Sequence, residues 1–316
     1  MLPHLLADLD TSKSYLIGFS GGADSALLAF LLKKHGYSVR LIHVNHGWSK
    51  ASADAEEIQQ FCEEWAKGYD IPLVCEPIIG DIVPKAVKRF GMEGAERQAR
   101  YAIFERNLQL GEVLLTGHHL DDSIETVLMN LCRGTSVNGL TGISPESDFS
   151  FSKLVRPLSK TKKSDILAMC AAEAVLYRHD RMNDESIQTR NFMRNEIIPL
   201  LVNRFGEQIY TSFTKVMENM SECSEIIHEA YSIDSASCAY RDNRVHVGKF
   251  LRLAPLHQQN FIYHFVQEHL RITLTKNHIR EVMKKMAVPS VLRVNVGGVE
   301  FIKHDGYFAV RRLKID

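Results

Sequence analysis

The chain has 316 residues and carries 38 Lys and Arg against 38 Asp and Glu, so its formal net charge is zero. Hydrophobic residues make up 45% and charged residues 24%, a balance typical of globular proteins that excludes a disordered chain. No apolar segment is long enough for a membrane helix, and the N-terminus lacks the pattern of a signal peptide, so we expect no membrane partner. The length suits two domains.

The six cysteines form no Cys-x-x-Cys pair, so we expect no zinc or iron–sulfur site and a reduced, cytoplasmic compartment. The charge is unevenly distributed, because residues 232–316 contain 14 Lys and Arg against 7 Asp and Glu, which leaves 24 against 31 elsewhere. A basic C-terminal part suits a polyanionic partner such as a nucleic acid, and it equally suits an ordinary basic surface.

The first predicted elements are a strand over 15–19 and a helix that contains the apolar run 26–32. Between them lies Ser20-Gly21-Gly22-Ala23-Asp24-Ser25. Two glycines let the backbone approach an anion closely, and the amides at the start of the helix can hold phosphate. The loop has neither the Gly-Lys-Ser/Thr ending of a Walker A motif nor Gly-x-Gly-x-x-Gly. The alternative is a tight turn with Asp24 or Ser25 as a helix cap.

The pattern then alternates, with strands predicted over 38–45, 72–79 and 113–116 and helices over 53–67, 93–110 and 120–133. This alternation predicts an α/β fold with a doubly wound, mostly parallel sheet. Polar clusters at Ser20, His43 and Gly117 each lie at a strand end, where such sheets bind ligands.

The remainder predicts a long loop over 134–152 and a helical segment over 190–205, which Pro199 should kink or restart. A further helix over 207–231 leads into a smaller helical domain, with helices over 256–270 and 276–286. Apolar runs over 291–296, 299–303 and 307–313 predict a closing antiparallel meander. We therefore expect a catalytic domain over 1–205 and a basic domain over 206–316.

A second polar cluster is Gly117-His118-His119-Leu120-Asp121-Asp122-Ser123-Ile124-Glu125-Thr126. Asp121 and Glu125 are four residues apart and share a helix face, where they could hold Mg²⁺, bind an ammonium group or accept a proton. Asp122 and Glu125 also have the spacing of a capping box, which is a purely structural alternative.

A third cluster covers 93–101. Arg97 and Arg100 lie on one helix face there, which suits binding of phosphate or an RNA backbone. The alternative is an intrahelical salt bridge such as Glu93 with Arg97.

Together these motifs resemble the tRNA(Ile)-lysidine synthetase family of the PP-loop ATP-pyrophosphatase superfamily. The resemblance rests on the order of segments 20–25, 42–47, 93–101, 117–126, 133–135 with 139–140, 156–158, 180–184 and 190–199. The chain departs from the family at Met182, which precedes Asn183 where a serine is usual. We also expect it to end before the further C-terminal domain of longer members.

The resemblance implies that ATP adenylates the C2 oxygen of the wobble cytidine in a CAU-anticodon tRNA(Ile), and that free L-lysine then displaces AMP. ATP and Mg²⁺ are the implied cofactors. A homodimer is left open. The implied nucleotide-binding residues are Ser20, Gly21, Gly22, Ala23, Asp24, Ser25, His43 and Gly117, with Asp24 also on Mg²⁺.

The implied catalytic residues are Asp24, Arg97, Arg100, Asp121 and Glu125. Arg97 or Arg100 would neutralise phosphate charge in the transition state. Asp121, together with Glu125, would bind the lysine ammonium and take its proton. The basic domain would contact tRNA phosphates.

Four alternative functions share part of the pattern. A tRNA 2-thiocytidine synthetase has the same loop but generally needs cysteine pairs, and the NAD and GMP synthetases need an ammonia source. A nucleotide-gated RNA-binding protein would not need the acidic and arginine clusters.

Overall fold

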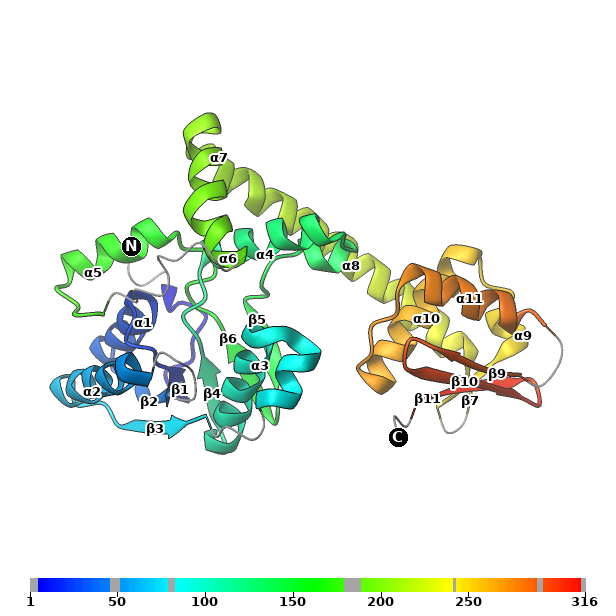
Figure 1. The fold of residues 1–316 in the computed structure, drawn as a ribbon, viewed down its shortest axis with the longest axis horizontal. Helices are drawn as coiled ribbons and strands as arrows, with labels where there is room; N and C mark the ends of the chain where they lie inside the picture. Colours follow the sequence, from blue (N-terminus) through cyan, green and yellow to red (C-terminus); the bar gives the residue numbers. More distant parts are fainter. Residues whose placement is uncertain are drawn as a thin grey trace. The chain divides into compact units, whose positions relative to one another are not determined.

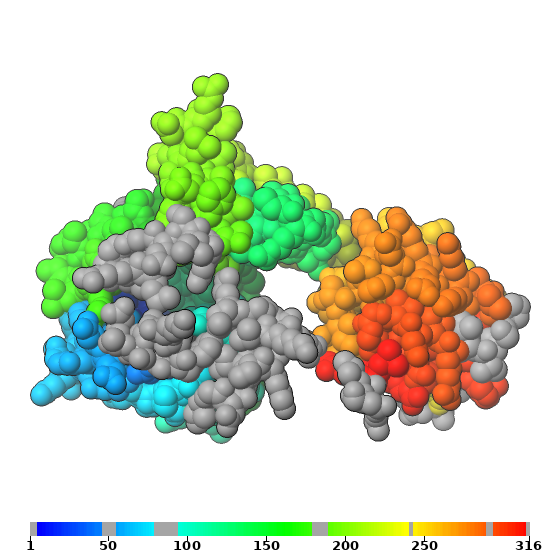
Figure 2. All heavy atoms as spheres, in the orientation of Figure 1, coloured from blue at the N-terminus to red at the C-terminus, as the bar shows by residue number. Residues whose placement is uncertain are grey.

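The computed structural model describes residues 5–45, 52–78, 83–178, 189–240, 243–288 and 292–313; the other residues are grey in Figure 2. The chain divides into two compact units, Met1–Met217 and Glu218–Asp316. The division falls within helix α8 (Gln208–Cys238). No helix among the described residues is both long enough and apolar enough to span a membrane.

Unit 1 is built on a six-stranded sheet with the order β3-β2-β1-β4-β6-β5 (Figure 1). Every neighbouring pair is parallel except β5 with β6. The predicted doubly wound, mostly parallel sheet is therefore confirmed. The strands are β1 (Ser14–Gly18), β2 (Ser38–Asn45), β3 (Leu73–Pro77), β4 (Glu112–Leu115), β5 (Glu146–Phe149) and β6 (Ser152–Val155).

The helices of unit 1 connect and cover this sheet. They are α1 (Ala23–Lys34), α2 (Ser52–Gly68), α3 (Val83–Asn107), α4 (Leu120–Arg133), α5 (Lys163–Ala172), α6 (Thr189–Phe192) and α7 (Ile198–Phe205), with a 3₁₀ turn η2 (Val137–Leu140) and a π-helical turn η4 (Met193–Ile197).

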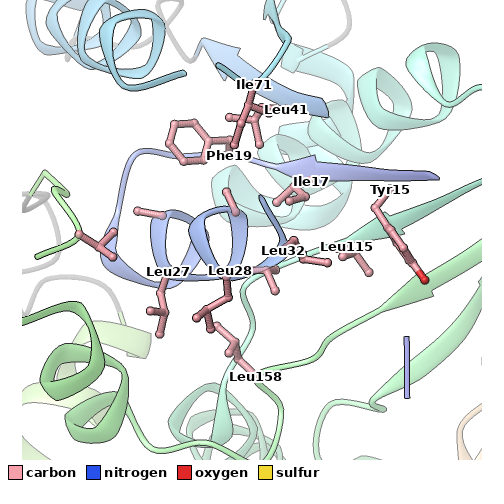
Figure 3. Close-up of a cluster of buried hydrophobic side chains, with 14 of the residues drawn as sticks. Tyr15, Ile17, Phe19, Leu27, Leu28, Leu32, Leu41, Ile71, Leu115 and Leu158 are labelled. Atoms are coloured by element: carbon pink, nitrogen blue, oxygen red, sulfur yellow. The ribbon is translucent and has the colours of Figure 1, made fainter. Parts of the chain in front are cut away.

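The alternating side chains of the central strand β1 enter two different cores. Tyr15 and Ile17 belong to a core with residues of α1, α2 and α5, among them Ile166. Figure 3 shows Tyr15, Ile17 and Leu28 of this core. Leu16 packs on the opposite face, with residues of α3. Burial on both faces explains why β1 is a continuous apolar run rather than an alternating one.

Strand β1 pairs with β2 on one side and with β4 on the other, so the chain order reverses between β1 and β4. In sheets of this kind, ligands bind beyond the carboxyl ends of the strands at that reversal. Ser20 follows β1 and Gly117 follows β4, so both predicted clusters lie where this rule places a ligand.

The prediction of a long loop over 134–152 is wrong in part, because η2 and β5 lie within it. Strand β5 pairs antiparallel with β6 at the sheet edge. Three of its four residues, Glu146, Ser147 and Asp148, are polar, so the strand shows no apolar pattern in the sequence. The prediction at Pro199 is confirmed, since α7 restarts with proline in its first turn.

Unit 2 contains the last part of α8, three helices and a five-stranded antiparallel sheet with the order β7-β8-β11-β10-β9. Its core includes Phe250, Phe261 and Phe301. The predicted closing meander is confirmed. The elements are β7 (Ala239–Tyr240), β8 (Arg244–His246), α9 (Val247–Phe250), α10 (Pro255–Leu270), α11 (Lys276–Met286), β9 (Leu292–Val296), β10 (Val299–His304) and β11 (Tyr307–Arg312).

Candidate active site

The glycine loop between β1 and α1 requires glycine at Gly21 for two reasons. Its φ is +78°, a conformation that other residues rarely adopt. A Cβ atom there would lie 3.1 Å from both Cys62 Sγ and Phe61 Cδ1 of α2. The loop is therefore fixed against α2 in a conformation that the sequence motif alone only suggests.

The start of α1 offers backbone donors to an anion. Gly22 is the N-cap residue, and no described side chain caps the helix there, so the first-turn amides of Ala23, Asp24 and Ser25 are available. Ser25 is buried; its hydroxyl donates to the Gly22 carbonyl at 3.1 Å and accepts from the Ser20 amide at 3.2 Å. Ser25 thus stabilises the loop, whereas the Ser20 side chain is exposed.

Gly117 brings the second polar cluster against the first. A Cβ at Gly117 would lie 3.1 Å from the carbonyl carbon and Cβ of Asp24 and 3.1 Å from the Ser25 amide nitrogen. The segment after β4 therefore runs directly along the first turn of α1. Two motifs that are far apart in the sequence form one site.

Lys163, the first residue of α5, connects carboxylates from two other helices. Its ammonium donates to Asp24 Oδ1 at 2.6 Å, and its backbone amide donates to Asp121 Oδ2 at 2.8 Å. The side chains of Lys163 and Asp24 are 35% and 26% exposed, so a ligand can reach the pair. Nothing in Lys160-Thr161-Lys162-Lys163 distinguishes one lysine from the others, so local sequence does not identify Lys163 as a site residue.

Asp121 is held from several sides. Besides the Lys163 amide, the Tyr210 hydroxyl donates to Asp121 Oδ1 at 2.9 Å, and His119 Nδ1 lies 3.4 Å from Oδ2. Burial by itself would raise the pKa of Asp121, but His119, the Lys163 amide and the Tyr210 hydroxyl outweigh burial and lower it. Asp121 therefore remains a carboxylate, and its Oδ2 already accepts a hydrogen bond from the first backbone amide of α5.

Glu125 lies on the same face of α4 but has a different environment. It is fully buried, and Arg194 binds both of its oxygens, with Nε 2.6 Å from Oε1 and Nη2 3.2 Å from Oε2. Arg194 also donates to Asp122 Oδ1 at 2.9 Å. Burial raises the pKa of Glu125, and the Arg194 charge opposes that rise. The geometry makes Glu125 the partner of an arginine rather than an open carboxylate.

The predicted capping box of Asp122 and Glu125 is wrong in its position. His119 is the N-cap residue of α4, and its backbone amide donates to Asp122 Oδ2 at 2.9 Å. Asp122 is therefore the third residue of the helix rather than its cap.

The adjacent histidines His118 and His119 have opposite electrostatic environments. Burial and the charges of Arg156, Arg97 and Arg100 lower the pKa of His118 to about 3. Burial also disfavours a charged His119, but carboxylates at Asp121, Asp122 and Asp24 outweigh it and raise the His119 pKa.

His119 Nε2 lies 3.8 Å from Asp24 Oδ1 and 3.6 Å from Asp122 Oδ2. The neutral imidazole of His118 therefore lies near the arginines. The imidazole of His119, which binds a proton more readily, lies near the carboxylates.

His43 lies behind the glycine loop. It is 4% exposed, and its Nδ1 bonds the Phe19 carbonyl at 2.9 Å. Burial lowers the pKa of His43, so this nitrogen donates from a neutral ring. In this geometry His43 supports the backbone just before the loop.

Arg97 and Arg100 flank the ring of Tyr101, with guanidinium carbons 4.8 Å and 5.9 Å from its centre. Burial lowers the pKa of Arg100, and the charges of Arg97 and Arg190 act in the same direction. The structure places both predicted arginines together. The proposed Glu93–Arg97 salt bridge and the motifs at 46–47 and 180–184 lie outside the residues whose side chains are described.

The donor set fits a magnesium ion that arrives with a nucleotide. Across the described ranges, no group of three or more His, Cys, Asp or Glu side chains is arranged to hold a metal. Mg²⁺ in nucleotide sites takes one or two carboxylates and completes its shell with phosphate oxygens and water. Asp24 meets that requirement, because its contacts with Lys163 and His119 both involve Oδ1 and do not use Oδ2.

The family model and the curated relatives that match this chain point to the same family. A model of the PP-loop domain matches residues 2–201. A curated tRNA(Ile)-lysidine synthase of Shigella flexneri is 34% identical over 252 residues, which cover 77% of this chain and 56% of that protein. One from Chlamydia caviae is also 34% identical, over 71% of this chain and 69% of that protein.

The chain spans about half the length of several such relatives, for example 52% of one from Escherichia coli O157:H7. Among solved structures, the U34-tRNA thiolase NcsA from Methanococcus maripaludis matches with a TM-score of 0.55 and 22% identity, over 70% of this chain and 77% of that one. That likeness supports the fold alone. The family model and the relative from Chlamydia caviae cover enough of the chain to assign it, and the chain belongs to the tRNA(Ile)-lysidine synthase family of PP-loop proteins.

Proposed function

We propose that this chain is a ligase that uses ATP to attach lysine to C2 of the wobble cytidine of a CAU-anticodon tRNA(Ile). The observation that carries the proposal is the single site formed by the glycine loop, Asp24, Lys163 and Asp121. It combines backbone donors for phosphate with a carboxylate that stays ionised. The curated relatives bear the name of this activity.

In the first step, the amides at the start of α1 bind the pyrophosphate part of ATP as the cytidine oxygen attacks the α-phosphorus. Lys163 lies at the same end of α1, and its ammonium can move from Asp24 to a phosphate oxygen. A magnesium ion held by Asp24 would neutralise phosphate charge. Arg97 and Arg100 supply further positive charge for the transition state.

In the second step, the lysine ε-amine replaces AMP. Its ammonium has a pKa of about 10.4 in water, so it must lose a proton before it attacks. Asp121 binds the ammonium by charge and accepts the proton. Glu125 is already paired with Arg194, so it supports this step by holding Arg194 in place rather than by binding the lysine ammonium itself.

The experiment is incubation of the chain with ATP, Mg²⁺, labelled lysine and bulk tRNA, followed by nucleoside analysis. We expect label in a modified cytidine of one tRNA and release of AMP and pyrophosphate. Pyrophosphate exchange into ATP, with and without tRNA, separates an enzyme from a nucleotide-gated RNA-binding protein. Absence of labelled nucleoside alongside active exchange would point to a different acceptor and contradict the proposal.

A further inference from the structure

A short segment that follows α5 lies against the glycine loop, and neither the sequence motifs nor the proposed function gives it a role. It covers residues 175–178 and belongs to no helix or strand. The backbone amide of Arg178 donates to the Gly21 carbonyl at 2.9 Å. The segment therefore forms a direct hydrogen bond with the loop from a distant part of the chain.

Trp65 of α2 holds this segment in place. Its indole Nε1 donates to the Leu176 carbonyl at 2.8 Å, and the residue is only 5% exposed. The same side chain packs against Phe19, the residue before Ser20, with ring centres 4.8 Å apart. Trp65 thus contacts both the segment and the chain from which the glycine loop starts.

The two ends of the segment have further contacts. The Val175 amide donates to the Cys170 carbonyl of α5 at 2.9 Å, and the Val175 side chain is buried in the core that includes α1 and α2. At the other end, Arg178 Nη2 donates to Glu57 Oε2 of α2 at 2.8 Å. The side chains of this ion pair are 32% and 67% exposed, so it contributes little. The backbone hydrogen bonds and Trp65, rather than the Arg178 charge, hold the segment.

The hydrogen bond from Arg178 determines the direction of one loop amide. The Gly21 carbonyl and the Gly22 N–H belong to the same peptide group, which is planar and trans, so they point in opposite directions. With the carbonyl directed at Arg178, the Gly22 N–H points to the other side of the loop. Its nitrogen lies 3.4 Å from Ser20 Oγ, a long contact to an exposed side chain, so it can exchange that partner for a stronger acceptor.

A peptide group between two glycines depends on such a hydrogen bond for its orientation. Because glycine has no Cβ, Gly21 and Gly22 tolerate backbone conformations that are closed to other residues. Rotation of their shared peptide group by half a turn would direct a carbonyl oxygen where the Gly22 N–H now points, and that oxygen would repel a phosphate. The two glycines let the backbone approach an anion closely, but they leave this orientation to a contact from outside the loop.

We propose that the Arg178 amide, held in place by Trp65, fixes the Gly21–Gly22 peptide group so that the Gly22 N–H binds the pyrophosphate part of ATP. The inference rests on the nucleotide-binding part of the proposed function and deepens it, because it assigns the contact that orients a phosphate donor. Arg178 and Trp65 are positioning residues, since both act through the loop backbone.

The test compares binding of ATP with binding of AMP, which keeps the base, the ribose and one phosphate but lacks the pyrophosphate part. Equilibrium dialysis with each labelled nucleotide and Mg²⁺ gives the two dissociation constants. Arg178→Pro removes the N–H, and Trp65→Phe keeps an aromatic ring but removes the donor to Leu176. We expect Arg178→Pro to weaken ATP binding at least about tenfold, the effect of one charge-assisted hydrogen bond, and Trp65→Phe to weaken it several-fold. AMP binding should stay close to that of the parent in both.

Two matched variants separate these hydrogen bonds from other effects. Arg178→Gln removes the charge and the pair with Glu57 but keeps the backbone amide. Tyr69→Leu disturbs the packing around Trp65, whose ring centre lies 4.2 Å from that of Tyr69, but keeps the indole donor. Both should retain the preference of the parent for ATP over AMP. Trp65→Phe places no proline in the backbone, so it tests the inference even if Arg178→Pro does not fold.

A parallel loss of ATP and AMP binding in Arg178→Pro and Trp65→Phe would indicate a general disturbance of the site and overturn the inference. So would an equal loss of ATP affinity in Arg178→Gln and Arg178→Pro, because the side chain would then be responsible. Lysine transfer to tRNA, together with an ATP preference that survives both substitutions, would leave the proposed function standing and remove this inference alone. The expected pattern of ATP binding without lysine transfer would support the inference and contradict the proposed function.

Discussion

The ammonium of Lys163 lies 2.6 Å from the carboxylate of Asp24, although the two residues are 139 positions apart in the chain. The contact joins the N-terminus of α5 to the first turn of α1, where the glycine loop ends. Since the backbone amide of Lys163 also binds Asp121, one residue contacts both the first turn of α1 and the first turn of α4.

Lys163→Met should impair ATP use more than it affects folding. The substitution removes a positive charge beside the proposed phosphate site but keeps the backbone amide that binds Asp121. We expect kcat/KM for pyrophosphate exchange to fall at least about tenfold. The free energy of unfolding should change by no more than about 1 kcal/mol, since the ion pair is partly exposed. Lys160→Met, at an exposed position three residues earlier, is the control. Equal exchange rates in the two variants would remove Lys163 from the nucleotide site.

Asp121→Asn should separate the two half-reactions. Asparagine keeps an oxygen that can accept from the Lys163 amide, so the start of α5 is preserved, but it neither holds an ammonium by charge nor accepts its proton. Adenylate formation should largely survive, whereas lysine transfer should fall by about two orders of magnitude. Pyrophosphate release and capture of labelled lysine measure the two steps separately. A parallel decrease in both steps would identify Asp121 as a structural cap or a metal ligand.

Gly117→Ala should disturb the alignment of the two motifs. The added Cβ would lie 3.1 Å from backbone and side-chain atoms of Asp24, which must then shift by a few tenths of an ångström. We expect at least about a tenfold loss of adenylation, because small misplacements at a reacting centre have large effects on rate. Gly68→Ala is the control, since a Cβ there meets nothing within 4 Å. Full adenylation by the Gly117 variant would show that the contact is not needed for alignment.

The two adjacent histidines should titrate in opposite directions. NMR titration of the imidazole signals should give His119 a pKa above the usual 6.5. His118 should have a pKa of about 3 and therefore stay neutral at any higher pH. Assignment by His118→Asn and His119→Asn identifies each signal. Two ordinary values near 6.5 would contradict the described environments.

The raised pKa of His119 also predicts how the free energy of unfolding depends on pH. A pKa raised by folding stabilises the folded state fully below the unfolded value of about 6.5 and loses that contribution as the pH rises through the folded value. The difference in the free energy of unfolding between the parent and His119→Asn should therefore be largest at acidic pH. A difference that grows towards alkaline pH would reverse the sign and refute the assignment.

Much of unit 1 could be predicted from local patterns. The helix over Leu120–Arg133 and the restart at Pro199 follow from apolar spacing and from backbone rules that act within a few residues. Strand β5 could not be found in this way, because a polar edge strand is defined by its partner β6 rather than by its own composition.

The sequence by itself determined the glycine loop and the fact that Asp121 and Glu125 share a helix face, since both are consequences of short-range geometry. Only the tertiary structure decided what each carboxylate does. Glu125 is neutralised by Arg194, 69 residues later, while Asp121 receives hydrogen bonds from α5 and α8. Such pairings depend on which helices pack together, and helical spacing carries no information about a partner from another part of the chain.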